Sequence, residues 1–124
     1  MKNSRKNRHL NRLLVVCVAI LAVAALVAAR PLSGSVTIVN NSNREIRNVY
    51  FSHVNADDWG ADQLAESHIA AGQSHTISNV TWDQQQLKVI GEDQDGCFLS
   101  TVVASGTDST WTITNDTVAD CGSN

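Results

Sequence analysis

The N-terminal segment most limits what this chain can fold into, because it removes about a quarter of the residues from the folded domain. Basic residues come first, and Leu13–Ala29 is then a run of 17 residues without a charge. The run ends on the small residues Val27-Ala28-Ala29. This order is typical of a secretory signal peptide. The sequence therefore predicts a signal peptide over residues 1–29, with 95 residues left to fold.

An uncleaved membrane anchor is the alternative for the same segment. Seventeen apolar residues lie at the lower limit of what spans a bilayer as a helix. If the segment stays, its basic end is retained inside, so the rest of the chain lies outside in either case. Cleavage would make Arg30 the first residue. We expect a protein that is periplasmic, secreted or on the outer face of the membrane.

The charge of the remaining chain excludes some partners. From Arg30 onward there are four basic and twelve acidic residues, a net charge of −8. Nucleic acids and anionic membranes both require basic patches on a protein that binds them. We therefore expect no nucleic acid partner, and membrane contact only through an uncleaved N-terminal segment. The negative charge suits solubility or cation binding.

Cys97 and Cys121 are the two cysteines of the exported part. Two cysteines in an oxidising compartment most simply form one disulfide. The bond would close a loop of about 25 residues and stabilise the fold by roughly 3–4 kcal/mol in the chain-entropy model. A domain of this size has a marginal core, so this contribution matters.

Short β-branched and aromatic runs separated by turn signals indicate an all-β domain. After a linker over residues 30–35, no stretch keeps a helical period, and Asp95-Gly96 has the pattern of a hairpin turn. We predict a small antiparallel β-sandwich of about seven strands over residues 36–124. The expected strands cover residues 36–39, 46–54, 67–70, 74–80, 87–92, 98–103 and 110–114.

One stretch of the chain resembles a group of small exported bacterial proteins of unassigned function. These share an Asn-rich turn, a strand ending in Tyr-x-Ser, an Asp-x-Trp-Gly-x-Asp-x-Leu loop and a later Gly-x-Ser. The matching residues here are Asn40-Asn41-Ser42, Tyr50-Phe51-Ser52, Asp57-Asp58-Trp59-Gly60-Ala61-Asp62-Gln63-Leu64 and Gly72-Gln73-Ser74. The resemblance implies a small β domain and transfers no activity.

The acidic loop is the one place where the sequence offers a candidate site. Asp57, Asp58 and Asp62 lie close together with a glycine between them, and Ca²⁺ prefers several oxygen ligands from one flexible loop. The alternative is structural: Asp57 or Asp58 caps a helical turn by accepting the amides that follow. In that interpretation Trp59 buries its ring against the sheet and anchors the loop. Calcium is therefore a possible cofactor, and no other is indicated.

No other pattern indicates chemistry. The spacing of His53, His68 and His75 matches no metal motif, and no Gly-x-Ser-x-Gly elbow is present. We interpret these histidines as surface or strand-edge residues. The sequence thus favours a non-enzymatic binding or structural module that meets an unknown protein or cell-surface partner. A calcium-binding module is the alternative, and a small hydrolase is the remote one.

Overall fold

The computed structural model describes residues 33–122, and every structural statement below concerns that part. The expected signal segment and residues 30–32 of the expected linker lie outside the described residues, and residues 33–35 of that linker belong to the first strand. Six strands are present: β1 (Ser33–Asn41), β2 (Ile46–Ser52), β3 (Ser74–Thr81), β4 (Gln86–Asp93), β5 (Phe98–Ala104) and β6 (Ser109–Thr114). Within these residues no helix is long and apolar enough to cross a membrane.

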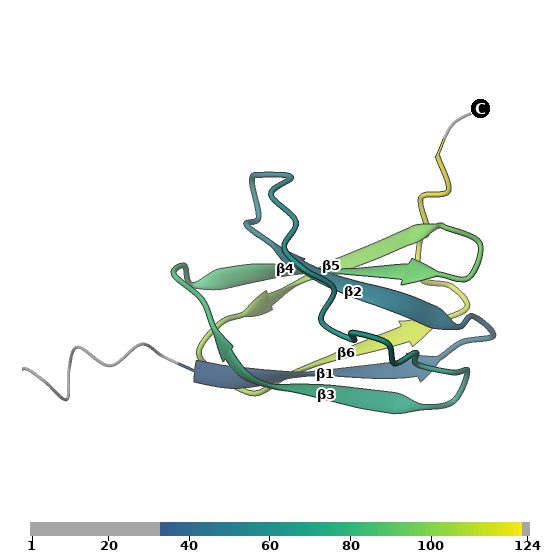
Figure 1. Cartoon of the computed structure of the whole chain (residues 1–124), viewed down its shortest axis with the longest axis horizontal. Helices are drawn as coiled ribbons and strands as arrows, with labels where there is room; N and C mark the ends of the chain where they lie inside the picture. The colour runs from purple at the N-terminus through teal and green to yellow at the C-terminus, as the bar shows by residue number, and fades with distance from the viewer. Residues whose placement is uncertain (1–32, 123–124) are drawn as a thin grey trace, which may run out of the picture. The chain divides into compact units, whose positions relative to one another are not determined.

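The strands form two three-stranded sheets, which Figure 1 shows as two layers. One sheet has the order β3-β1-β6, and the other has the order β2-β4-β5. The chain changes sheet after β1, β2, β3 and β5, so only β4 and β5 follow each other within one sheet. The all-β prediction is confirmed, and so is the hairpin at Asp95-Gly96, where β4 pairs antiparallel with β5.

Two details of the sequence prediction are wrong. The segment expected as a strand over residues 67–70 makes only an isolated bridge between Ile69 and Ile46, so there are six strands and not seven. The sheets are also not wholly antiparallel, because β1 pairs parallel with β6. A sequence pattern reports which residues are extended, whereas the direction of a neighbouring strand depends on how the chain crosses between sheets.

The core lies between the two sheets. Alternate residues along each strand point inward, as the two-residue period of a strand requires. The first sheet contributes Ile38 and Ile113, and the second contributes Val49, Val89 and Leu99, all with at most 1% of their surface exposed. This alternation gives most strands one buried face, whereas in β4 the consecutive residues Val89, Ile90 and Gly91 are all buried.

A buried asparagine organises the turn between the sheets. Asn40 is fully buried, and its side-chain amide donates to the carbonyl oxygens of Arg44 (2.7 Å) and Ile69 (3.1 Å). The hydroxyl of Ser42 donates to the Asn40 side-chain oxygen at 2.6 Å. Because buried polar groups must be paired, this side chain fixes the turn after β1 against the segment before β3.

The hairpin between β4 and β5 depends on a buried carboxylate. Asp93 is 2% exposed, bonds to Arg44 at 2.6 Å, and accepts the amides of Asp95 and Cys97, each at 2.9 Å. Burial works against its ionisation, but the Cys97 amide and the Arg44 guanidinium together hold the pKa of Asp93 below its ordinary value. Asp93 is therefore a buried, internally bonded carboxylate, unlike the exposed Asp95 of the same turn.

The expected disulfide is confirmed. Cys97, at the end of the hairpin turn, is bonded to Cys121, 24 positions later in the chain. The adjacent residues Phe98 and Asp120 form an antiparallel bridge with N–O distances of 2.7 and 2.8 Å. The disulfide and the bridge together hold the C-terminal segment along the outer edge of β5.

Reduction of this disulfide should lower the stability of the fold considerably. Closing a loop of this length contributes roughly 3–4 kcal/mol through the entropy of the unfolded chain. In a domain of this size that corresponds to a fall in Tm of roughly 15–25 °C. Differential scanning calorimetry of the protein with and without reductant, and of Cys97→Ala/Cys121→Ala, measures the effect. An unchanged Tm in both comparisons would contradict the account.

Candidate functional site

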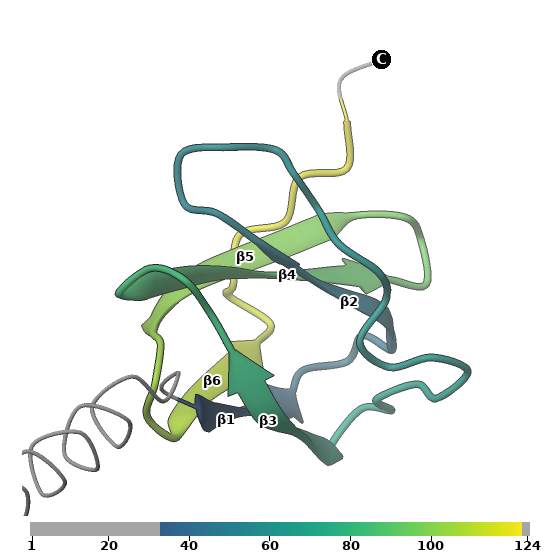
Figure 2. The same ribbon diagram turned by 60° about the vertical axis from the view of Figure 1, so that its left-hand side comes forward.

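The long connection between β2 and β3 dominates one side of the molecule. In Figure 2 it first rises above the β2-β4-β5 sheet, then descends beside β2 before it enters β3. Its backbone bonds to the outer edge of β2, with Gly60 N donating to Phe51 O (3.1 Å) and Gln63 N donating to Val49 O (2.7 Å). The connection therefore covers an edge that would otherwise expose unpaired backbone groups.

Asp62 attaches the β2–β3 connection to β2 by hydrogen bonds. Its carboxylate accepts the Val49 amide at 2.9 Å, the Asn48 side chain at 2.9 Å and the Leu64 amide at 3.1 Å. Leu64 follows it into the core, where it is 3% exposed. We expected Asp57 or Asp58 to cap a helical turn by accepting the amides that follow, and this is wrong. Asp62 instead accepts the following amide of Leu64, where the chain turns to bring Leu64 inward.

Trp59 packs on the outer face of the β2-β4-β5 sheet. Its ring stacks on Tyr50, with 5.5 Å between ring centroids, and meets the edge of Phe98 at 5.0 Å. Ile90 lies opposite Tyr50 in the ladder and is 2% exposed. Trp59 itself remains 39% exposed. The indole therefore anchors the loop against the sheet, as the structural interpretation expected, but on the outer face and only partly buried.

Asp58 bonds backward along the chain to the end of β2. One carboxylate oxygen accepts the Ser52 hydroxyl at 3.0 Å and the His53 amide at 2.9 Å, and the other bonds to His53 Nδ1. On the opposite side of the imidazole, Nε2 bonds to Asp83 at 2.7 Å. We call His53, Asp58 and Asp83 the histidine clamp. It joins the β2–β3 connection to the turn between β3 and β4.

The clamp favours a charged imidazole. Hydrogen bonds to Asp58 and then to Asp83 raise the pKa of His53 above 6.5, and the bond to His53 lowers the pKa of Asp58 to about 2. The pKa of Asp83 is lowered by the same partner. The imidazole also lies against the Trp82 indole, with 4.6 Å between ring centroids. A cation held at that distance from an aromatic face is stabilised further.

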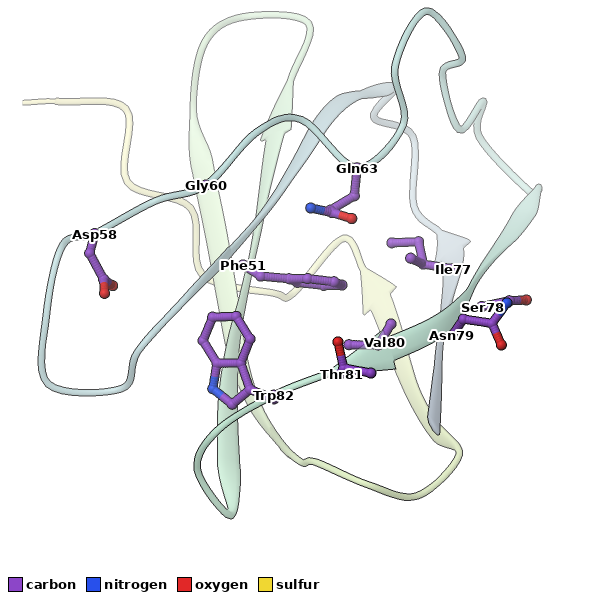
Figure 3. A pocket seen from close by; sticks show the side chains of 10 residues that line it. All are labelled: Phe51, Asp58, Gly60, Gln63, Ile77, Ser78, Asn79, Val80, Thr81 and Trp82. Carbon is purple, nitrogen blue, oxygen red and sulfur yellow. The ribbon is translucent and has the colours of Figure 1, made fainter. Parts of the chain in front are cut away.

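A groove of about 400 Å³ lies between β2 and β3, beneath the covering loop (Figure 3). Phe51, Val80 and Trp82 provide apolar surface, and the side chain of Gln63 points into the same space. The other lining residues are Asp58, Gly60, Ile77, Ser78, Asn79 and Thr81. Apolar walls with a few amide and hydroxyl groups are typical of sites that bind small molecules or short peptide segments.

The three aspartates of the candidate calcium site do not converge. The side chain of Asp57 is 93% exposed and lies 3.7 Å from Lys88, while Asp58 and Asp62 accept donors from different parts of β2. Among residues 33–122, no three His, Cys, Asp or Glu side chains are placed to hold a metal ion. Two of the three carboxylates are instead held by hydrogen bonds within the protein.

Sequence reasoning missed the histidine clamp and the role of Trp82. His53 and Asp83 are 30 positions apart, and no spacing rule connects a residue after one strand with a residue in a later turn. The proximity of His53 to Asp58 is the only local signal. Trp82 packs against the core, but nothing in the sequence indicated that it would line a groove.

Comparison with known proteins gives little further information. No protein-family model matches the chain, and no curated protein does. Among solved structures, the chain is similar to one described as "NMR structure of the protein from Eubacterium rectale". The identity is 16%, the match covers 72% of this chain and 84% of that one, and the TM-score is 0.49. So distant a similarity assigns no function.

Asp62→Ala should destabilise the protein by about 2–3 kcal/mol, because three donors lose a charged acceptor. Asp57→Ala is the matched control, and its exposed carboxylate should contribute less than about 0.5 kcal/mol. For each variant, the loss in the free energy of unfolding should be the same in the presence of calcium and in the presence of a chelator. Urea denaturation measures the free energy of unfolding, and equal losses for the two variants would contradict this role of Asp62.

The clamp should also make stability depend on pH. The pKa of His53 is raised on folding. Its contribution to the free energy of unfolding is therefore fully present below pH 6.5 and is lost as pH rises through the raised pKa. Because the pKa of Asp58 falls from 3.8 to about 2, its contribution is present above 3.8 and is lost as pH falls toward 2. The Tm difference between the protein and His53→Gln should therefore be largest between these limits. A difference that does not vary from pH 3 to pH 9 would contradict the clamp.

Proposed function

We propose that the chain is an exported, non-enzymatic binding module whose ligand occupies the groove between β2 and β3. The proposal is based on the groove itself. The groove combines Phe51, Val80 and Trp82 with the amide side chain of Gln63, on strands and a loop that are held in place by hydrogen bonds. A rigid site of mixed polarity binds a ligand with little loss of conformational entropy.

The bonding of Ser52 and His53 supports binding over hydrolysis. A serine nucleophile requires a neighbouring base that can accept its proton. Here the Ser52 hydroxyl donates to Asp58 at 3.0 Å and to the Ala56 carbonyl at 2.8 Å. Both ring nitrogens of His53 are already bonded to carboxylates. The histidine therefore acts as a cationic bridge between two segments, and a hydrolase has no support from this arrangement.

The calcium alternative has less support than the groove. Ca²⁺ requires several oxygens that converge on one point. The Asp58 and Asp62 oxygens already accept backbone amides at 2.9 Å, and Asp57 lies beside Lys88. Binding a cation here would require these hydrogen bonds to break.

Export is supported by the disulfide and by the N-terminal pattern. A disulfide between Cys97 and Cys121 is typical of proteins that fold in an oxidising compartment. Residues 1–29 have the order of basic, apolar and small residues that a signal peptide has. The proposed partner is therefore a protein or surface component outside the cytoplasm.

Binding of defined probes to the isotopically labelled full chain tests the proposal. The probes are blocked di- and tripeptides with apolar, cationic or anionic side chains, observed by amide chemical shifts. We expect shifts to cluster at Gly60, Gln63 and residues 77–82. Thr81→Trp, which fills the groove, should abolish them.

Thr112→Trp is the matched control, because Thr112 is also an exposed strand threonine but lies on β6. It should leave the shifts unchanged. Two results would overturn the proposal: probes that perturb only residues away from the groove, or turnover of a probe that His53→Gln abolishes.

A further inference from the structure

The outer edge of β3 is the exposed strand edge next to the groove. β3 pairs with β1 on one side, and no backbone hydrogen bond from residues 33–122 reaches its other side. The edge of β2 is covered by its own connection, and the end of β5 is bridged by Asp120. An uncovered edge presents unpaired N–H and C=O groups that can pair with another extended chain.

β3 also lacks the residues that usually prevent such pairing. Its sequence, SHTISNVT, contains no Lys, Arg, Asp, Glu or Pro. One bulge is present: the register shifts between Gly34 and Val36, opposite Ser78 and Asn79, and Asn79 has a φ of 55°. The bulge interrupts the pairing after Ile77, so Ser74–Ile77 is the longest regular stretch before pairing resumes at Val80 and Thr81. It turns both Ile77 and Val80 inward, each 9% exposed.

The free edge and the groove adjoin each other. Ile77 belongs both to the regular part of β3 and to the groove lining. In Figure 3, Ile77 and Val80 face the space bounded by Phe51 and Gln63. A chain that extended the β3-β1-β6 sheet at this edge would direct alternate side chains into that space, since successive side chains of a strand point to opposite faces.

The charge of the domain indicates what kind of chain would fit. The part from Arg30 onward carries −8, no basic residue lines the groove, and Asp58 lines it. Asp83 follows directly after Trp82, and the two carboxylates of the histidine clamp exceed the single positive charge of His53 between them, so the clamp stays net negative. Two copies of this chain would repel each other across their β3 edges, whereas a basic segment would be attracted. Charge complementarity therefore favours a cationic partner over self-association.

We propose that an extended cationic peptide segment of a partner protein binds as an added strand along Ser74–Ile77, with its apolar side chains in the groove. This proposal rests on the proposed function, for which it names the ligand class and the mode of binding. Main-chain hydrogen bonds supply affinity in such strand addition, and the pockets for alternate side chains supply selectivity.

A blocked hexapeptide that alternates lysine and valine is the probe, and the full chain is the receptor. In a strand, the N–H groups of alternate residues point to the same edge. N-methylation of the three lysines and N-methylation of the three valines therefore block opposite edges of the peptide. We expect one methylated peptide to bind at least about tenfold more weakly and the other within about twofold of the parent.

Amide exchange and charge variants give independent readouts. Alternate amides of Ser74–Ile77 should become protected when the peptide binds. The peptide with glutamate in place of lysine should bind at least about tenfold more weakly. Ser78→Lys should weaken the parent peptide by about tenfold, whereas Ser100→Lys, an equally exposed serine on β5, should change it by less than about twofold.

Three results would overturn strand addition while leaving the groove as the binding site. In the first, both methylated peptides bind as well as the parent. In the second, the chain dimerises through β3 and excludes the peptide. In the third, the peptide does not bind although smaller probes still shift residues 77–82. If neither the peptide nor any smaller probe reaches the groove, the proposed function fails as well.

Discussion

The covering of β2 by its own connection is the constraint on which the rest of the structure depends. A two-sheet fold with three strands in each sheet has few interior strands, so most of its strands lie at an edge. The chain covers one edge with residues 53–69, fastened by Asp62 and by the bridge at Ile69. It leaves the facing edge of β3 uncovered. The groove lies between the covered edge of β2 and the uncovered edge of β3.

The histidine clamp links this cover to the opposite side of the groove. Asp58 belongs to the connection after β2, and Asp83 belongs to the turn after β3. The imidazole between them bonds to both and packs against the tilted indole of Trp82, so it joins the two segments. The same Trp82 indole lines the groove, and its N–H is buried without a hydrogen-bond partner. Asp58 and Trp82 therefore belong both to the groove lining and to the surroundings of His53.

Much of the fold could be predicted from the sequence, because strands, turns and one cysteine pair leave local signals. The β-branched run Val36–Val39 and the Asp95-Gly96 turn identified β1 and the hairpin correctly. The acidic loop was harder, since three nearby aspartates are compatible with metal binding and with capping. Only the structure assigns Asp62 to the β2 edge and Asp58 to the clamp. The parallel pairing of β1 with β6 and the partnership of His53 with Asp83 depend on long-range topology, which no local pattern encodes.

Amide hydrogen exchange of the free chain tests the central claim most directly, because it reports which strand edges are covered. The amides of Val49, Gly60 and Gln63 bond across the covered edge of β2, so they should be protected. Alternate amides of Ser74–Ile77 face the uncovered edge and should exchange rapidly. The opposite pattern, with rapid exchange in the connection and uniform protection along β3, would contradict the account.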